Sequence, residues 1–558
     1  MKTYVIKTLC LILLFGTTML KSNAQGKIPA DLKQVKNVIM MIPDGTSTSV
    51  LSLARWYQSY NSSELIWLTT DEIITGLVKT HSSDAPIGDS APTGSTYASG
   101  VVSQAGYVST YPEKTDNDIV PVDAALANTP AFTILEAAKL KGMATGLAFT
   151  CEFTHATPAD FSSHTPNRSN RAAIAPQMVY NHIDVVFGGG TDYLKPEHRQ
   201  YLAQHGWDTI FYDYNRFKSF SGTKAWALFA PKDVPFDFDR DPNAVPSLAE
   251  MTKKAIETLS KGDNGFFLMV EGSKVDYAAH ANDPIGIISE YLAFDKAVKE
   301  ALDFAKKDGQ TAIVICPDHG NSAVSIGNTA STSGYNKLSK RELFEPLMNC
   351  KLTAYGLAEK LAKKEKFDES FVRQQFKEQM GMDITQPEVQ KFKSPMNRNS
   401  ISAIGDAVIS VINARTFIGF TTGGHTGEDV FLATYHPQGQ VLTGTAINTD
   451  VNRYMCELLG VGNLADLTKK YFAGHKKLFP ENAYSIIWDK KNKDEPTLTI
   501  TSNATKKVLR VKAFENQVFV GKSIKDKNMQ RIPMETVAVY VDKNEEFYLP
   551  AELKEYLD

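Results

Sequence analysis

Acidic and imidazole side chains in this sequence stand directly after short apolar runs. The clearest cases are run 38–43 before Asp44, run 266–270 before Glu271, and run 312–317 before Asp318 and His319. Such runs are typical of strands buried on both faces of a parallel sheet. Ligands of open α/β sheets bind beyond the carboxyl ends of the strands. The pattern therefore predicts one site, built from distant stretches of chain and rich in hard ligands.

Two further apolar runs lead into the same predicted site. Run 146–149 precedes His155 and Thr157, and run 184–187 precedes three consecutive glycines at 188–190. These runs add an imidazole, a hydroxyl and a flexible turn to the predicted edge of the sheet.

Glu271, Asp276 and His280 form the strongest local group. Gly272 lets the chain turn after Glu271, and Asp276 and His280 are four positions apart, which places them on one helical face. Imidazole with carboxylates suits Zn²⁺, whereas carboxylates alone suit Mg²⁺. Taken alone, Asp276 and His280 also fit a solvated pair on a helix surface.

The other candidate ligands also have structural explanations when each is taken separately. Asp44 and Asp318 could cap the helices that follow them, and His425, in a glycine-rich loop, could have no role. What favours a metal site is that all the candidates recur at comparable strand ends. The candidate ligands are Asp44, Thr157, Glu271, Asp276, His280, Asp318, His319 and His425.

Composition narrows the class of partner. The chain has 558 residues, 42% of them hydrophobic and 22% charged, which is typical of a large globular protein. Its formal net charge of −3 offers no basic excess for a nucleic acid or an anionic membrane. We therefore expect small-molecule ligands and no nucleic-acid partner.

Residues 1–24 have the layout of a cleavable secretory signal. Lys2 and Lys7 precede a short apolar stretch, and small residues lead to Ala24, where we expect cleavage. The stretch is too short for stable membrane insertion, so the mature protein is expected to be periplasmic or secreted. After residue 24 the chain has four cysteines. They contain no C-x-x-C pair and do not form a disulfide framework.

The order of apolar runs and helical patterns predicts an α/β fold. We expect a doubly wound, mostly parallel sheet sandwiched by helices in a catalytic domain at residues 25–480, with helices at 131–141, 247–260 and 287–307. Residues 331–400 are predicted to be a helical insertion, including helices at 352–364 and 367–380. Strands are expected to resume at 407–412, 416–420 and 431–435. Residues 481–558 are predicted to form a small C-terminal β-rich extension.

The stretch around Asp89 and Ser90 carries a family resemblance. Its sequence, I-G-D-S-A-P-T-G-S-T, resembles the active-site stretch of the alkaline phosphatases, in which the nucleophilic serine opens a helix. Pro92 and Ser95 differ from the commoner residues at those points. Further blocks agree with the family in order across residues 37–427: N-V-I-M-M-I-P-D-G, T-H-A-T-P-A, H-T-P-N-R, V-E-G-S-K-V-D-Y-A-A-H, P-D-H-G and G-G-H-T-G.

The resemblance implies a phosphomonoesterase with two zinc ions and one magnesium ion. Ser90 would attack phosphorus to form a phosphoserine intermediate, and Arg168 would grip the phosphoryl oxygens. A serine hydroxyl is a weak nucleophile until a metal or a base activates it, so the implied roles agree with the chemistry. The implied ligand sets are Asp276, His280 and His425 for one zinc, Asp44, Asp318 and His319 for the other, and Asp44, Thr157 and Glu271 for magnesium.

Two residues beside the implied site depart from the bacterial pattern. His155 stands where relatives often have an aspartate near magnesium, and Tyr277 stands where some have a lysine near phosphate. Losing one negative charge should weaken magnesium binding and let zinc or another divalent ion compete at the third position. With Tyr277 in place of that lysine, a positive charge near the phosphate is lost, which should loosen phosphate binding and hasten product release.

Three other functions compete with this interpretation. A sulfatase of the same superfamily needs an arginine where Gly94 stands, which argues against that activity. A phosphodiesterase stays open, although Arg168 favours monoesters by gripping a second free oxygen. An exported metal- or phosphate-binding protein without turnover would fit better if Ser90 or Arg168 were absent. The family also implies a possible homodimer.

Overall fold

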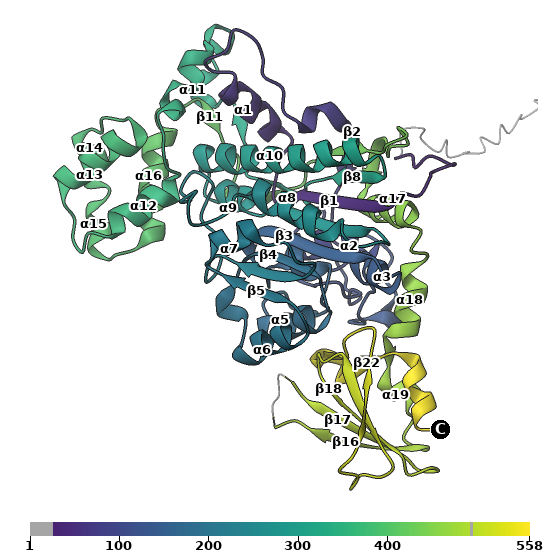
Figure 1. Cartoon of the computed structure of the whole chain (residues 1–558). Helices are drawn as coiled ribbons and strands as arrows, with labels where there is room; N and C mark the ends of the chain where they lie inside the picture. Colours follow the sequence, from purple (N-terminus) through teal and green to yellow (C-terminus); the bar gives the residue numbers. More distant parts are fainter. Residues whose placement is uncertain (1–25, 492–494) are drawn as a thin grey trace, which may run out of the picture.

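The computed structural model describes residues 26–491 and 495–558 (Figure 1). Its centre is a ten-stranded sheet in the order β14-β2-β13-β8-β1-β7-β3-β4-β6-β5. The strands in that order are Gly444–Ile447, Ile74–Lys79, Val430–Tyr435, Thr311–Ile315, Asn37–Pro43, Phe266–Gly272, Ala144–Glu152, Val185–Gly189, Ala225–Leu228 and Asp208–Phe211.

The five apolar runs form neighbouring parallel strands in the middle of this sheet. Strand β1 pairs in parallel with β7 and β8, and β3 pairs in parallel with β7 and β4. Strand β13 runs antiparallel to both β2 and β8, so the sheet is mixed but mostly parallel. The predicted fold class is confirmed.

Helices cover both faces of the sheet, which explains why the strands are apolar without alternation. Ile39 and Met41 of β1 face a core shared with α8 (Leu248–Leu259) and α10 (Pro284–Asp308). Val38, Met40 and Ile42 face a second core with α2 (Ser90–Ser99), α3 (Ile134–Leu140) and α17 (Asn448–Leu459). The three helices expected at 131–141, 247–260 and 287–307 correspond to α3, α8 and α10.

A group of helices stands beside the sheet in Figure 1. Residues 352–364 and 367–380 are helical as expected, in α12 and in α13 with the turn of π-helix that continues it. The helices of this group are α12 (Ala354–Ala362), α13 (Glu369–Gln375), α14 (Gln386–Gln390), α15 (Lys393–Asn397) and α16 (Ile401–Asn413), with the π-helix at Phe376–Met380. The preceding helix, α11 (Lys340–Met348), lies beside α1 (Ser49–Gln58) instead.

The prediction of a strand at 407–412 is wrong, because these residues belong to α16. Buried Ile404, Val408 and Val411 recur at helical spacing, and α16 packs against α12. Periodicity alone cannot assign so short an apolar run. Within 416–420 only β11 (Ile418–Gly419) is a strand, and it pairs with β10 (Ser325–Ile326) outside the main sheet. Residues 431–435 lie in β13, as expected.

The C-terminal strands form a separate antiparallel sheet with its own core, drawn in yellow-green in Figure 1. Its strands are β16 (Tyr484–Asp489), β17 (Thr497–Ser502), β18 (Val508–Lys512), β19 (Gln517–Gly521) and β20 (Gln530–Pro533). A smaller sheet pairs β15 (Ala473–Gly474) and β21 (Val539–Val541) with β22 (Glu546–Leu549).

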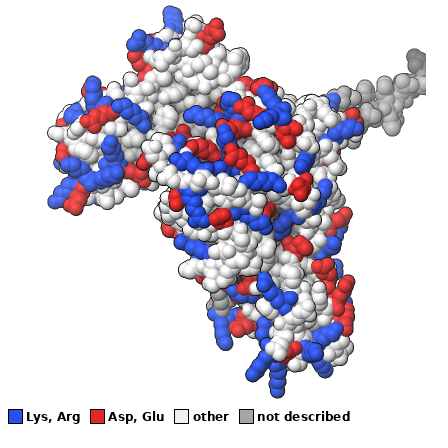
Figure 2. Space-filling model, viewed as in Figure 1, with Lys and Arg blue, Asp and Glu red and all other residues white. Residues whose placement is uncertain are grey.

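The expected signal segment 1–24 lies outside the described residues. Among the described residues, no helix combines the length and apolar character needed to cross a membrane. Cys151, Cys316, Cys350 and Cys456 are all buried and unbridged. Figure 2 shows basic and acidic side chains interspersed over the visible face, in keeping with the small net charge.

Replacing Ile39 with alanine should destabilise the protein, because this central-strand side chain is fully buried. We expect a loss of about 2–5 kcal/mol in the free energy of unfolding, measured by urea denaturation. Ile487→Ala is the control, because Ile487 is 50% exposed, and it should cost about 0.5 kcal/mol or less. Equal losses in the two variants would contradict the central position of β1.

Candidate active site

Asp44, Asp318 and His319 converge where β1 and β8 end. The Nε2 atom of His319 lies 3.6 Å from Asp44 Oδ1 and 3.3 Å from Asp318 Oδ2, and all three side chains are fully buried. The backbone N–H of Gly45 donates to Asp318 Oδ1 at 3.0 Å, which links the two strand ends. One ligand atom from each of the three residues lies within 4.8 Å of the others, so together they could hold a metal ion.

Asp276, His280 and His425 form an adjoining group. Asp276 and His280 lie on α9 (Lys274–His280), and His425 lies on β12 (His425–Thr426). The Asp276 carboxylate is 3.4 Å from His280 Nε2 and 3.6 Å from His425 Nε2. His319 also falls within 4.8 Å of Asp276 and His425, so it joins the two groups.

The hydrogen bonds of His280 and His425 involve Nδ1 and leave Nε2 able to bind a metal ion. His280 Nδ1 lies 2.8 Å from the Gly423 carbonyl oxygen, and His425 Nδ1 lies 2.9 Å from that of Gly88. A neutral imidazole that donates from Nδ1 carries its lone pair on Nε2. The two Nε2 atoms are only 3.0 Å apart. Two lone pairs facing each other at that distance favour a cation between them.

Ser90 opens helix α2 beside both groups. Its Oγ lies 3.3 Å from His319 Nε2 and 3.5 Å from Asp44 Oδ1, and the residue is 2% exposed. Asp89 holds the N-cap position but makes no side-chain bond to the helix, so its carboxylate is free for another partner. The start of α2 therefore presents a hydroxyl, and a helix N-terminus that favours anions, to the candidate metal ligands.

Arg168 is held over this position by Asp89 and His155. Its Nη1 donates to Asp89 Oδ1 at 2.6 Å, and its Nη2 lies 3.3 Å from His155 Nε2. Burial alone would raise the pKa of Asp89, but the charge and hydrogen bond of Arg168, together with the nearby His319 and His425, lower that pKa. Burial, with the charge of Arg168 adding to it, lowers the pKa of His155 to about 3. Asp89 is thus a carboxylate and His155 a neutral imidazole.

Glu271, Thr157 and His155 lie at the ends of β7 and β3. Thr157 is in α4 (Ala156–Asp160), and His155 caps that helix. Cys151, near the end of β3, joins them: its thiol donates to Glu271 Oε2 at 3.3 Å. The sequence reasoning missed Cys151, because a cysteine in an apolar run resembles an ordinary core residue.

Buried polar atoms without partners show that these residues fit metal ions. A buried oxygen without a hydrogen bond carries a substantial cost, and a divalent cation would remove it. Among the described residues, the unpartnered buried atoms of the site are Asp44 Oδ2, Asp318 Oδ2, Glu271 Oε1, Thr157 Oγ1 and His155 Nδ1.

The buried, crowded carboxylates of the site have raised pKa values. Burial, followed by the charges of Asp318, Asp276 and Glu271, raises the pKa of Asp44 well above its usual value. Burial also raises the pKa of Glu271 to about 8. A protein without metal therefore tends to protonate these groups, whereas a divalent cation would keep them ionised.

Tyr277 lies between the site and the helical group. Its ring meets the His155 ring edge-on at 5.9 Å, and its hydroxyl donates to Asp233 Oδ1 at 3.4 Å. Tyr277 also lines a cavity of about 460 Å³ together with Tyr355 and Ile401 of the helical group. That group therefore supplies a wall next to the site.

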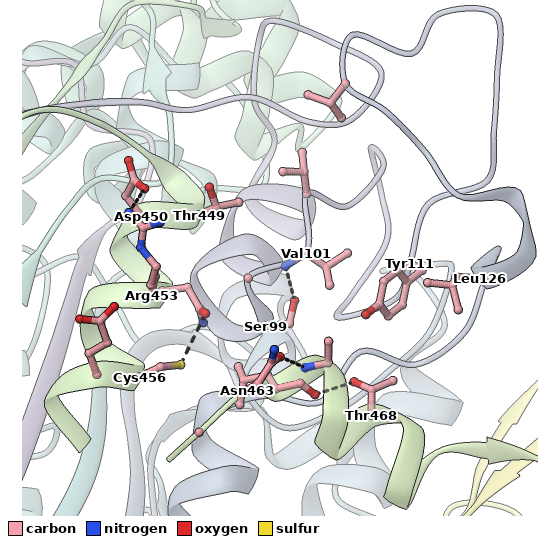
Figure 3. Close-up of a pocket in the computed structure, with 18 of the residues that line it drawn as sticks. Ser99, Val101, Tyr111, Leu126, Thr449, Asp450, Arg453, Cys456, Asn463 and Thr468 are labelled. Atoms are coloured by element: carbon pink, nitrogen blue, oxygen red, sulfur yellow. Dashed lines mark hydrogen bonds and ion pairs between the residues drawn. The ribbon is translucent and has the colours of Figure 1, made fainter. Parts of the chain in front are cut away.

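A larger cavity of about 1230 Å³ lies at the other end of α2 (Figure 3). Ser99 and Val101 line it from one side, and Thr449, Asp450 and Arg453 of α17 line it from the other. None of the predicted site residues is among the residues that line this cavity. It is therefore separate from the site around Ser90.

Without metal, the protein should lose thermal stability as the pH rises. The folded-state pKa of Glu271 is about 8, against an ordinary 4.5. Its stabilising contribution is therefore complete below about pH 4.5 and is lost as the pH rises through about 8. We expect the melting temperature of chelator-treated protein to fall over this window, and Glu271→Gln to flatten the fall.

Exposed Glu365→Gln is the matched control and should keep the wild-type slope. Added zinc or magnesium should reverse the fall in wild type. A melting temperature that depends on pH equally in Glu271→Gln and wild type would count against the crowding of these carboxylates.

The comparisons with known proteins agree with this geometry. The alkaline phosphatase family model matches residues 35–209 and 215–461. The chain is 34% identical over 451 residues to alkaline phosphatase 3 of Bacillus subtilis (strain 168), covering 79% of this chain and 92% of the relative.

Solved structures share the fold. The cold-active alkaline phosphatase from the psychrophile Shewanella sp. is 26% identical with a TM-score of 0.67, covering 76% of this chain and 99% of that one. A variant of the alkaline phosphatase from the Antarctic bacterium TAB5, solved with magnesium bound, is 23% identical with a TM-score of 0.52, covering 77% and 99%. Because the family model spans every strand end that builds the site, the chain belongs to the alkaline phosphatase family and is a hydrolase of phosphoric monoesters.

Proposed function

We propose that this enzyme cleaves small phosphomonoesters through a phosphoserine intermediate on Ser90. The observation that carries the proposal is the position of Ser90 Oγ, within 3.5 Å of both Asp44 and His319 at the start of a helix. The Ser90 oxygen would form a bond to phosphorus while the bond to the alcohol oxygen breaks. Water would then attack phosphorus and release Ser90 and inorganic phosphate.

Arg168 would hold the phosphoryl group during both steps. A guanidinium offers two parallel donors that match two phosphate oxygens. Asp89 fixes one side of the guanidinium through the 2.6 Å contact to Nη1. A monoester presents three non-bridging oxygens and up to two negative charges, whereas a diester presents two such oxygens and one negative charge. This arrangement favours monoesterase over phosphodiesterase activity, which remains the alternative function.

We further propose two zinc ions and a third divalent ion, magnesium or another, as cofactors. Asp276, His280 and His425 would hold one zinc, and Asp44, Asp318 and His319 the other. The third ion would lie beside Asp44, Thr157 and Glu271. Such ions would supply Lewis acidity that lowers the pKa of the serine hydroxyl and stabilises the leaving oxygen. Support comes from the unpartnered buried oxygens of these residues.

His155 and Tyr277 would adjust metal and phosphate affinity. A neutral imidazole at His155 contributes no negative charge to the third metal position, so magnesium should bind more weakly there than beside a carboxylate. Tyr277 places an aromatic ring rather than a cation near the phosphate. Weaker phosphate binding and faster product release follow from that replacement.

The proposed mechanism is tested by comparing an aryl phosphomonoester with the matching diester and sulfate. We expect turnover of the monoester to be fastest and to stop after chelation. Ser90→Ala should lower kcat/KM on the order of a thousandfold or more, because the attacking oxygen is lost. Ser99→Ala, at the far end of the same helix, is the control and should leave activity close to wild type.

Other outcomes separate the alternatives. A preference for the diester would identify a phosphodiesterase. Metal and phosphate binding without turnover of any ester would identify an exported binding protein. Turnover that survives chelation, or a Ser90→Ala enzyme as active as Ser99→Ala, would overturn the proposed mechanism.

A further inference from the structure

Cys151 is the one thiol of the described residues that lies within a group able to hold a metal. Its Sγ is 3.3 Å from Glu271 Oε2, and one ligand atom each of Cys151, His155 and Glu271 lies within 4.8 Å of the others. Cys151 and Glu271 are both fully buried. A thiol, an imidazole and a carboxylate therefore meet with solvent excluded from two of the three.

The spacing of these atoms fits direct coordination. Zinc binds sulfur at about 2.3 Å and carboxylate oxygen at about 2.0 Å. Around a tetrahedral ion, those two ligand atoms would be separated by about 3.5 Å. The observed sulfur-to-oxygen distance of 3.3 Å is close to that value, so both atoms could bind one ion after a small movement.

Two unpartnered atoms point to a missing ligand at the same place. Glu271 Oε1 and His155 Nδ1 are buried and make no hydrogen bond among the described residues. Cys350 shows what an ordinary buried thiol looks like, since its Sγ approaches only the carbonyl oxygens of Pro346 and Met380. The surroundings of Cys151 are different in chemistry, with ionisable groups in place of backbone carbonyls.

We propose that Cys151, His155 and Glu271 ligate a transition-metal ion, zinc or cobalt, at the third metal position. The proposal rests on the proposed function, because it changes the ligands and the ion at one of its three metal positions. A soft thiolate favours zinc over magnesium, which prefers oxygen ligands alone. The thiol would lose its proton to solvent on binding, and thiolate plus carboxylate would balance the two positive charges of the ion.

Metal binding at this position would also release part of Arg168. A guanidinium can only donate, so its 3.3 Å contact requires the lone pair of His155 on Nε2 and the ring proton on Nδ1. Coordination through Nδ1 moves that proton to Nε2, which can no longer accept from Arg168. Both N–H groups of Nη2 are then available to phosphate oxygens, while Nη1 stays with Asp89.

The test is an absorption measurement on the full-length protein stripped of metal and reloaded with cobalt. A thiolate ligand gives a sulfur-to-cobalt charge-transfer band in the near ultraviolet. We expect the band in wild type and in Cys350→Ser, and its loss in Cys151→Ser and Cys151→Ala. The band should persist in wild type when magnesium is added in excess. A band that is absent from wild type, or that survives in Cys151→Ala, would overturn the proposal.

A second measurement needs no variant and so does not depend on folding of the mutants. X-ray absorption of zinc-loaded wild type should show sulfur scattering at about 2.3 Å from part of the bound zinc. Only nitrogen and oxygen neighbours would overturn the assignment. Failure of the proposed phosphatase mechanism would look different: phosphomonoester turnover would be absent or independent of Ser90 while the sulfur signal remained.

Discussion

Repulsion between buried carboxylates at the ends of the central strands governs this structure. Asp44 and Asp318 are fully buried. Burial raises the pKa of Asp44, and the charges of Asp318, Asp276 and Glu271 raise it further. Like charges in a medium of low dielectric repel strongly, and each loses the solvation it had in water. The parallel sheet imposes this arrangement, because β1, β7 and β8 all end at one edge. Divalent cations are the simplest means of relieving it.

The same constraint explains how the proposed catalytic groups are held. The candidate ligands come from positions as far apart as 44 and 425, so their spacing depends on strands packed between two helical layers. Ser90 is fixed by the fully buried helix α2 and not by a mobile loop. Arg168 does lie between helices, but Asp89 holds its guanidinium in place. Rigid support of this kind lets binding groups act without reorganising during the reaction.

Sequence patterns predicted the strand ends well, because a strand buried on both faces requires an uninterrupted apolar run. Asp44, Glu271 and Asp318 were located in this way, and the four-residue spacing placed Asp276 and His280 on one face. The same reasoning failed for α16, where a run at 407–412 fitted helix and strand equally. Cys151 was missed because its type and setting are those of a core residue, and only the three-dimensional contact with Glu271 distinguishes it. The Arg168–Asp89 contact joins residues 79 positions apart and has no local signal. The roles of Ser90 and Arg168 came from the family resemblance and not from periodicity.

The central claim is that the folded chain places Ser90 Oγ among the metal ligands as the group that receives phosphate. The most direct measurement is to incubate zinc-loaded enzyme with inorganic phosphate under mildly acidic conditions, quench it, and locate bound phosphate by peptide mass spectrometry. The account predicts phosphate on the peptide that contains Ser90, dependent on metal and absent from Ser90→Ala. Phosphate on another residue, or an active enzyme in which no phosphorylated peptide forms, would contradict it.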